Sequence, residues 1–254
     1  MSLVRAAHII LASASPRRSS IMNEQLGLNV RAIASGFAED LDKGSLNPVF
    51  YVQETARQKA LEVFGRCEKP FKAQHNRPPS LVIGADTVVV LDGEIMEKPS
   101  SMEDARRMLR ALSDAGTHSV ITGVCMLYGG TELGAEPYEK TFAEITTVSF
   151  KKLSDEEINA YVSSGEPMDK AGAYGIQGLG GCFVEGITGD YFNVVGFPVS
   201  RFSSEIEVSR LQEWVAAAPK EELPEAPEEE PCDPLAPIIS DECMDEEECG
   251  LPSD

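Results

Sequence analysis

The 254-residue chain has few of the residues and motifs on which several common enzyme classes depend. It contains three histidines and six cysteines, and neither residue type occurs at the spacing of a zinc site or as a C-x-x-C pair. It also lacks a G-x-S-x-G elbow and a G-x-x-x-x-G-K-S/T phosphate loop. A zinc enzyme, a serine hydrolase and a P-loop protein are therefore disfavoured, and the cysteine thiols are expected to be reduced and unpaired.

Long apolar runs are absent too. The apolar residues around Ile9 fall far short of the roughly 20 that cross a bilayer, so no membrane partner is expected. Arg5, the apolar residues after it and Ala12-Ser13-Ala14 imitate a signal peptide, but the apolar core is too short and contains His8. Together with unpaired thiols, these features favour a cytoplasmic protein.

Positive charge is scarce, and the negative charge is unevenly distributed. The formal net charge is -20, and residues 216–254 hold 14 acidic residues and one basic residue, which leaves about -7 for residues 1–215. An acidic body disfavours a nucleic-acid partner, although compact basic pockets remain compatible with it. Residues 216–254 have too little apolar surface to offset the entropy of ordering. We expect a disordered tail, either an arm for an unknown partner or a solubilising extension.

Helical and strand-like apolar patterns alternate along residues 1–215, which predicts an α/β fold. Local sequence signals predict a hairpin turn at Asp92-Gly93 and capping boxes at Ser101 with Asp104 and at Ser154 with Glu157. Strands are expected at 8–11, 29–34, 81–91, 94–99, 119–127, 140–150 and 191–195, helices at 16–26, 49–64, 102–112, 154–162 and 203–216, and polar loops at 35–48 and 66–80.

Two arginines lie where a helix begins. Ser15 is a typical N-cap and Pro16 a typical first helical residue, so Arg17 and Arg18 fall in the first turn. Cations there oppose the helix dipole at a cost of about 0.3–1 kcal/mol each. A phosphate bound by the strand, loop and helix would compensate. The alternative is a pair of solvated surface arginines.

Asp86 interrupts the most strand-like segment, residues 81–91. A buried carboxylate needs a cation, a donor or a metal, so Asp86 is either a structural ion-pair partner or a ligand for a hard divalent cation. Glu39 in a loop, Lys59 on the helix at 49–64 and Lys98 after the hairpin are weaker candidates. Each has an ordinary alternative as a solvated, snorkelling or edge-strand charge.

Residues 172–181 contain five glycines, but no G-x-G-x-x-G register fits them. Such a density predicts close approach of the backbone to a ligand, where Gln177 could offer a donor and an acceptor to a base edge. A purely structural turn is the alternative.

In this order, the fragments resemble the Maf family of nucleoside triphosphate pyrophosphatases over about residues 6–215. The resemblance rests on Ser13-Ala14-Ser15-Pro16-Arg17-Arg18, Ala56-Arg57-Gln58-Lys59-Ala60, Gly84-Ala85-Asp86-Thr87, Glu97-Lys98-Pro99 and the segment from Asp169 to Gly178. It implies a two-lobed α/β fold with a long mixed sheet and a cleft between the lobes, often dimeric.

The resemblance also implies hydrolysis of a nucleoside triphosphate between its α and β phosphorus atoms. Arg18 and Ser13 would grip the phosphates, with Arg17 and Thr87 as further substrate-binding residues. Lys59 and Lys98 would neutralise developing charge, and Glu39 and Asp86 would hold Mg²⁺ or Mn²⁺ and a water, either carboxylate serving as the general base. Gln177 resembles the branch that acts on dTTP and UTP rather than the 7-methyl-GTP branch. The alternative function is a non-catalytic nucleotide-binding module linked to cell division.

Overall fold

The computed structural model describes residues 8–39, 41–43, 46–75, 79–129 and 136–207. The chain divides into two units, Met1–Ala218 and Pro219–Asp254. The predicted tail and its boundary at 215/216 lie outside the described residues. In the part of the chain described, no helix has both the length and the apolar character needed to cross a membrane.

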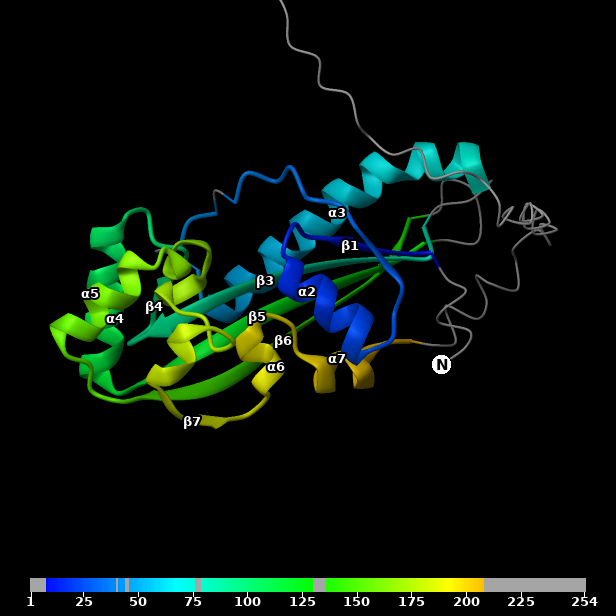
Figure 1. The fold of residues 1–254 in the computed structure, drawn as a ribbon. Coiled ribbons are helices and arrows are strands. Elements are labelled where there is room, and N and C mark those ends of the chain that lie inside the picture. Colours follow the sequence, from blue (N-terminus) through cyan, green and yellow to red (C-terminus); the bar gives the residue numbers. More distant parts are fainter. Residues whose placement is uncertain (1–7, 40, 44–45, 76–78, 130–135, 208–254) are drawn as a thin grey trace, which may run out of the picture. The chain divides into compact units, whose positions relative to one another are not determined.

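A mixed seven-stranded sheet forms the centre of the first unit (Figure 1). The strand order is β2-β1-β3-β5-β6-β7, with β4 paired to β3; β2, β1 and β3 are parallel, and the other pairs are antiparallel. The strands are β1 (Ile9–Ala12), β2 (Val30–Ala32), β3 (Leu81–Leu91), β4 (Glu94–Met96), β5 (Thr117–Tyr128), β6 (Tyr138–Phe150) and β7 (Val184–Thr188). The predicted α/β class is confirmed, and β7 is a strand that the glycine-rich sequence did not reveal.

The central strand β3 has one divided edge. β5 pairs with β3 along one edge from Leu81 to Val90, so β1 and β4 share the other. There β1 pairs as far as Gly84, and β4 pairs only from Val89. Residues 85–88 therefore lie at a gap between the carboxyl ends of two strands, a place where α/β proteins commonly bind ligands.

The hairpin that brings β4 back is confirmed. Asp92 and Gly93 have φ values of 51° and 86°, the left-handed pair that a tight two-residue hairpin requires.

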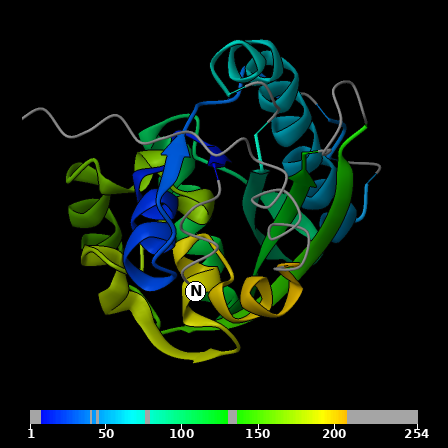
Figure 2. The ribbon, with the colours of Figure 1, turned by 90° about the vertical axis from the view of Figure 1, so that its right-hand side faces the viewer.

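Helix α3 (Pro48–His75) covers one face of the sheet, as the turned view in Figure 2 shows. Gly84 and Gly123 let it lie close: a Cβ on Gly84 would stand 3.0 Å from the Cβ of Ala60, and one on Gly123 would stand 2.6 Å from the backbone nitrogen of Gln53. The helix holds the predicted segment 49–64. The loop predicted at 66–80 was wrong for its first ten residues, which continue the helix through Pro70. One proline removes one hydrogen bond, and the surrounding Lys, Ala and Gln residues favour a helix.

The opposite face of the sheet carries α2 (Pro16–Ser20), its continuation as a π-helix (Ile21–Gln25), and α7 (Val199–Glu205). The predicted helix at 16–26 is confirmed, with its π-helical half unforeseen. The helix predicted at 203–216 begins earlier, at Val199, and ends at Glu205; residues 208–216 lie outside the described residues.

Helices α4 (Met102–Ala115) and α5 (Asp155–Ser163) pack together at one end of the sheet. Both halves of the predicted capping box at Ser154 and Glu157 are present. At α4 only one half of the predicted capping box is present. The Ser101 side chain caps the helix, but the Asp104 carboxylate accepts the backbone N–H of Ser100 and not that of Ser101.

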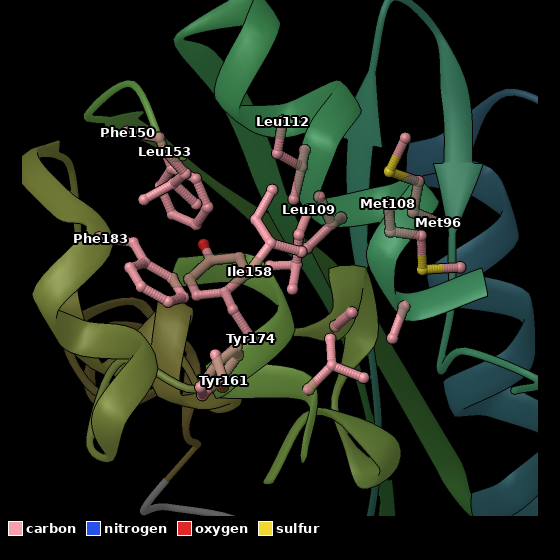
Figure 3. Close-up of a cluster of buried hydrophobic side chains, with 14 of the residues drawn as sticks. Met96, Met108, Leu109, Leu112, Phe150, Leu153, Ile158, Tyr161, Tyr174 and Phe183 are labelled. Carbon is pink, nitrogen blue, oxygen red and sulfur yellow. The ribbon is translucent and has the colours of Figure 1, made fainter. Parts of the chain in front are cut away.

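Residues 191–195 form helix α6 (Tyr191–Val195) and not the predicted strand. Asp190 decides this locally, because its carboxylate accepts the backbone N–H of Phe192 at 2.8 Å as an N-cap. Short 3-10 helices lie before α6, at Glu166–Asp169, Ala171–Ala173 and Leu179–Phe183. Figure 3 shows the aromatic core into which this region packs, with Tyr161, Tyr174 and Phe183 beside Leu109 and Ile158.

Candidate functional site

A cavity of about 470 Å³ opens at the divided edge of β3. The structure brings every sequence-predicted site residue to it, from segments more than 160 positions apart. They are Ser13, Arg17, Arg18, Glu39, Lys59, Asp86, Thr87, Lys98 and Gln177.

The carboxylates meet on the α3 face of the sheet. Even-numbered residues of β3 face α3, so Asp86 points at Lys59, whose Nζ lies 2.7 Å from Asp86 Oδ1 and 3.0 Å from Glu39 Oε1. The side chains of Lys59 and Asp86 are each 10% exposed, against 48% for Glu39. Asp86 thus has the ion-pair partner that a buried carboxylate needs, but shares it with a second carboxylate. Glu39 has a φ of 54°, a left-handed conformation that is rare for glutamate and concentrates at functional sites.

Arg18 lies on the other face of the same strand edge. Its guanidinium donates to Thr87 Oγ1 at 2.9 Å, to the Gly196 carbonyl at 2.9 Å and to Ser13 Oγ at 3.2 Å. All these acceptors are neutral, so they fix its position and leave its charge unbalanced by direct contact. Burial lowers the pKa of Arg18, and the nearby Asp86 carboxylate opposes this shift. Arginine stays charged in proteins, so the cavity holds a half-buried cation with N–H groups that make no bond to the residues described.

Arg17 has a different environment. It forms an ion pair with Asp169, with 3.0 Å between Nη1 and Oδ2, and a longer contact of 3.4 Å with the Asp169 carbonyl. An anion does compensate this arginine at the helix start, and it comes from the chain itself. The predicted substrate contact of Arg17 stays a prediction.

Lys98 follows β4 and is exposed at the cavity, with no hydrogen bond or ion pair to any residue the structure describes. Its neighbour Glu97 is a lining residue that sequence reasoning missed. The Glu97 carboxylate accepts from Tyr51 at 2.6 Å and pairs with Lys43 from the Glu39 loop. Burial, followed by the Glu97 contact, raises the pKa of Tyr51, so this hydroxyl stays a donor. The sequence did hold a signal for Glu97, because this residue lies beside Lys98 in the fragment Glu97-Lys98-Pro99.

The glycine-rich segment forms a second wall of the cavity. Gln177 is exposed on it, and its amide has no partner among the described residues. Asp169, Lys170 and Tyr174 also line this wall and were not foreseen as site residues. Beneath it, the Tyr174 hydroxyl lies 2.8 Å from His118 Nε2, and burial lowers the pKa of His118 to about 4.

The donor set suits a hard divalent cation. Within the described residues no group of three or more His, Cys, Asp or Glu side chains could hold a metal. Mg²⁺ usually keeps several waters and takes one or two protein carboxylates together with substrate phosphates. Glu39 and Asp86 both place a carboxylate oxygen against Lys59 Nζ, and this pair of carboxylates fits the ligands that a protein supplies to such a site.

Comparisons of the sequence with a family model and with known proteins agree with one another. A model of the family described as Maf-like protein matches residues 8–208. The chain is 47% identical over 191 residues to the dTTP/UTP pyrophosphatase of Thermococcus onnurineus, covering 75% of this chain and 92% of that protein. It is 44% identical over 203 residues to the dTTP/UTP pyrophosphatase of Clostridium perfringens, covering 78% and 95%.

A human protein named as a probable bifunctional dTTP/UTP pyrophosphatase/methyltransferase is 47% identical over 200 residues, which is 78% of this chain and 31% of the human one. Among solved structures, a Ham1 protein from Coxiella burnetii matches with a TM-score of 0.37 at 12% identity, over 83% of this chain and 97% of that one. A nucleoside-triphosphatase, or dITP/XTP pyrophosphatase, from Mycobacterium abscessus matches with a TM-score of 0.34 at 14% identity, over 57% and 74%.

Proposed function

The chain belongs to the Maf family, and from this premise we propose that it hydrolyses dTTP and UTP at the α–β phosphoanhydride, releasing the monophosphate and pyrophosphate. The observation that carries the proposal is the grouping of Arg18, Lys59 and Lys98 with two carboxylates around one cavity. Hydrolysis at phosphorus asks mainly for positioning and for stabilisation of charge, which fixed cations supply.

The cations divide the work by their surroundings. Arg18 is held by neutral acceptors and keeps N–H groups for phosphate oxygens, while Ser13 and Thr87 fix its orientation. Lys98 has no partner within the described part of the chain, so its ammonium is available to a phosphate. Lys59 balances Glu39 and Asp86 and brings them together.

We propose that Glu39 and Asp86 hold a divalent cation, Mg²⁺ or Mn²⁺, together with the triphosphate. When bound, the cation would neutralise phosphate charge and stabilise pyrophosphate as the leaving group. The proton of the attacking water passes to one of the two carboxylates as general base. The pH profiles of Asp86→Asn and Glu39→Gln assign it, because the variant that loses the base loses the acidic limb of kcat/KM.

A substrate panel tests the function. Pyrophosphate release is measured with Mg²⁺ for dTTP, UTP, dCTP, dATP and dGTP, and dTTP and UTP are expected to turn over fastest. Lys98→Ala is expected to lower turnover strongly, whereas Lys152→Ala, at a surface lysine paired with Asp114, is the matched control and should leave it unchanged. Equilibrium binding of dTTP without pyrophosphate over hours would instead support the non-catalytic nucleotide-binding module.

Location and assembly complete the proposal. Cys67, Cys125 and Cys182 are free thiols, which supports a reducing, cytoplasmic location. A homodimer is proposed from the family alone, and light scattering of the purified 254-residue chain tests it.

A further inference from the structure

The turn that displays Gln177 is held from below by two side chains outside the cavity, Glu166 and Tyr161. The Glu166 carboxylate accepts the backbone N–H of Leu179 at 2.9 Å and that of Gly180 at 3.3 Å. It also accepts the Tyr161 hydroxyl hydrogen at 3.0 Å. The same hydroxyl oxygen accepts the N–H of Gly175 at 3.1 Å. One carboxylate and one phenol therefore fix both ends of residues 175–180.

This arrangement accounts for glycines that the sequence assigned to close approach of a ligand. A Cβ on Gly178 would overlap the Glu166 carboxylate, 2.6 Å from its Cδ atom. A Cβ on Gly180 would stand 2.7 Å from the Tyr161 hydroxyl oxygen. A side chain at Gly178 would push the Glu166 carboxylate away from the turn, and one at Gly180 would also meet the Gly175 backbone, 2.9 Å from its nitrogen, so both glycines let Glu166 and Tyr161 stay against the backbone.

Both groups are themselves well fixed. The Tyr161 ring lies in the aromatic core of Figure 3, edge-on to Phe183 with ring centroids 4.9 Å apart. Burial raises the pKa of Tyr161, so its hydroxyl remains a donor. Burial alone would raise the pKa of Glu166, but the N–H groups of Leu179 and Gly180, together with the Tyr161 hydroxyl and the charge of Lys170, lower that pKa. Glu166 is thus a carboxylate that only accepts.

We propose that Glu166 and Tyr161 are positioning residues that set the base preference of the enzyme. The Gln177 amide has no partner among the residues that the structure describes, so its direction is determined by the backbone of residues 175–180, and Glu166 and Tyr161 determine that backbone. Neither lines the cavity or contacts Lys59, Asp86 or Arg18. The inference rests on the proposed function, since it concerns how that function selects its base.

Three variants test it through kcat and KM for dTTP and dGTP. Glu166→Ala removes every acceptor and is expected to lower the dTTP/dGTP ratio of kcat/KM at least tenfold, through KM for dTTP, with kcat changed less than threefold. Glu166→Gln keeps one acceptor oxygen and should recover part of the ratio. Tyr161→Phe keeps the ring packing and should lower the ratio by a smaller factor than Glu166→Ala. Glu157→Gln, at a carboxylate of α5 that binds Lys151 and not the turn, is the matched control and should leave the ratio unchanged.

The outcomes separate the inference from the function beneath it. If wild type releases pyrophosphate but folded Glu166→Ala keeps the wild-type ratio, or loses both substrates equally, the positioning role is overturned. If Glu166→Ala does not fold, as judged by circular dichroism, Tyr161→Phe decides on the same ratio. If wild type hydrolyses nothing, the function fails, and the inference is decided by the ratio of Kd values for dTTP and dGTP in the same variants.

Discussion

The two walls of the cavity are built on opposite principles. On the charged wall, formed by Arg18, Glu39, Lys59 and Asp86, the side chains are bonded to one another or to the sheet. On the glycine-rich wall, formed by residues 172–180, the backbone is bonded from below, and the Gln177 side chain makes no bond to any described residue. One wall fixes its side chains, and the other fixes the backbone that carries a free side chain.

The difference separates chemistry from selection. Charges that are held before substrate arrives need no reorganisation during the reaction and serve any triphosphate alike. A residue that contacts the base, such as Gln177, can change without disturbing those charges when it lies on a segment outside the sheet. Substitutions on the charged wall should therefore lower activity for every nucleotide, and substitutions on the glycine-rich wall should change the ratio between nucleotides.

The largest effect is expected where the buried charges meet. Lys59→Met leaves Asp86 and Glu39 without their shared cation, so we expect kcat to fall about a thousandfold for all nucleotides. The free energy of unfolding should fall by about 3 kcal/mol, because a buried carboxylate loses its partner. Asp86→Asn should cost less stability, since Lys59 keeps Glu39. Urea unfolding and pyrophosphate release measure both quantities.

The double variant Lys59→Met/Asp86→Asn separates these effects. It removes both members of the buried pair, so stability should recover in part while activity stays lost. Activity above one tenth of wild type in any of these variants would contradict the catalytic assignment of the charged wall.

Arg18→Lys comes next. A single ammonium cannot span Ser13, Thr87 and the Gly196 carbonyl, so the cation shifts and kcat/KM should fall about a hundredfold. The fall should be equal for dTTP and dGTP. Arg106→Lys on the surface of α4 is the control and should behave as wild type. A loss confined to dTTP would move Arg18 to the selecting wall.

Gln177→Ala should sharpen the contrast from the other side. Loss of two hydrogen bonds to the base, at about 1 kcal/mol each, lowers kcat/KM for dTTP and UTP about 10- to 30-fold. The value for dGTP should change less than twofold, because no base contact is lost. Gln25→Ala, exposed on the π-helix after α2, is the control. Equal losses for all nucleotides would show that Gln177 serves the phosphates.

Sequence reasoning predicted best what local chemistry decides. The capping box at Ser154 and the turn at Asp92-Gly93 depend on neighbours within three residues, and both are present. Helix α3 was underestimated because Pro70 outweighed its helix-favouring neighbours, and α6 was mistaken for a strand because its Asp190 cap was overlooked.

The site was predicted as residues but not as contacts. Motif likeness identified side chains that the divided edge of β3 then gathers in one cavity. Their partners come from far along the chain, as Asp169 does to Arg17 across 152 positions, and no local pattern reveals such a pair. The same holds for Glu166, whose importance appears only when the turn above it is in place.

The stability of the fold is expected to depend on pH through His118, which lies beneath the glycine-rich wall. The folded pKa of His118, about 4, lies below its ordinary value of 6.5, because burial disfavours the charged ring. The unfolded chain therefore binds a proton first, and stability is lost as pH falls from about 6.5 towards 4. Between pH 6 and pH 5 the loss should be about 1 kcal/mol, measured by urea unfolding, and absent in His118→Gln. The same pH dependence in both proteins would contradict it.

Arg17→Ala should have the smallest effect and tests where the charged wall ends. Its charge is already paired with Asp169, and that partly exposed ion pair is worth roughly 0–1 kcal/mol. Removing a cation from a helix start regains a similar amount, so stability should stay within about 0.5 kcal/mol. We expect kcat/KM to change less than threefold for every nucleotide. A loss of tenfold or more, shared by dTTP and dGTP, would mean that substrate displaces Asp169 and that Arg17 acts with Arg18, as the sequence motif alone predicts.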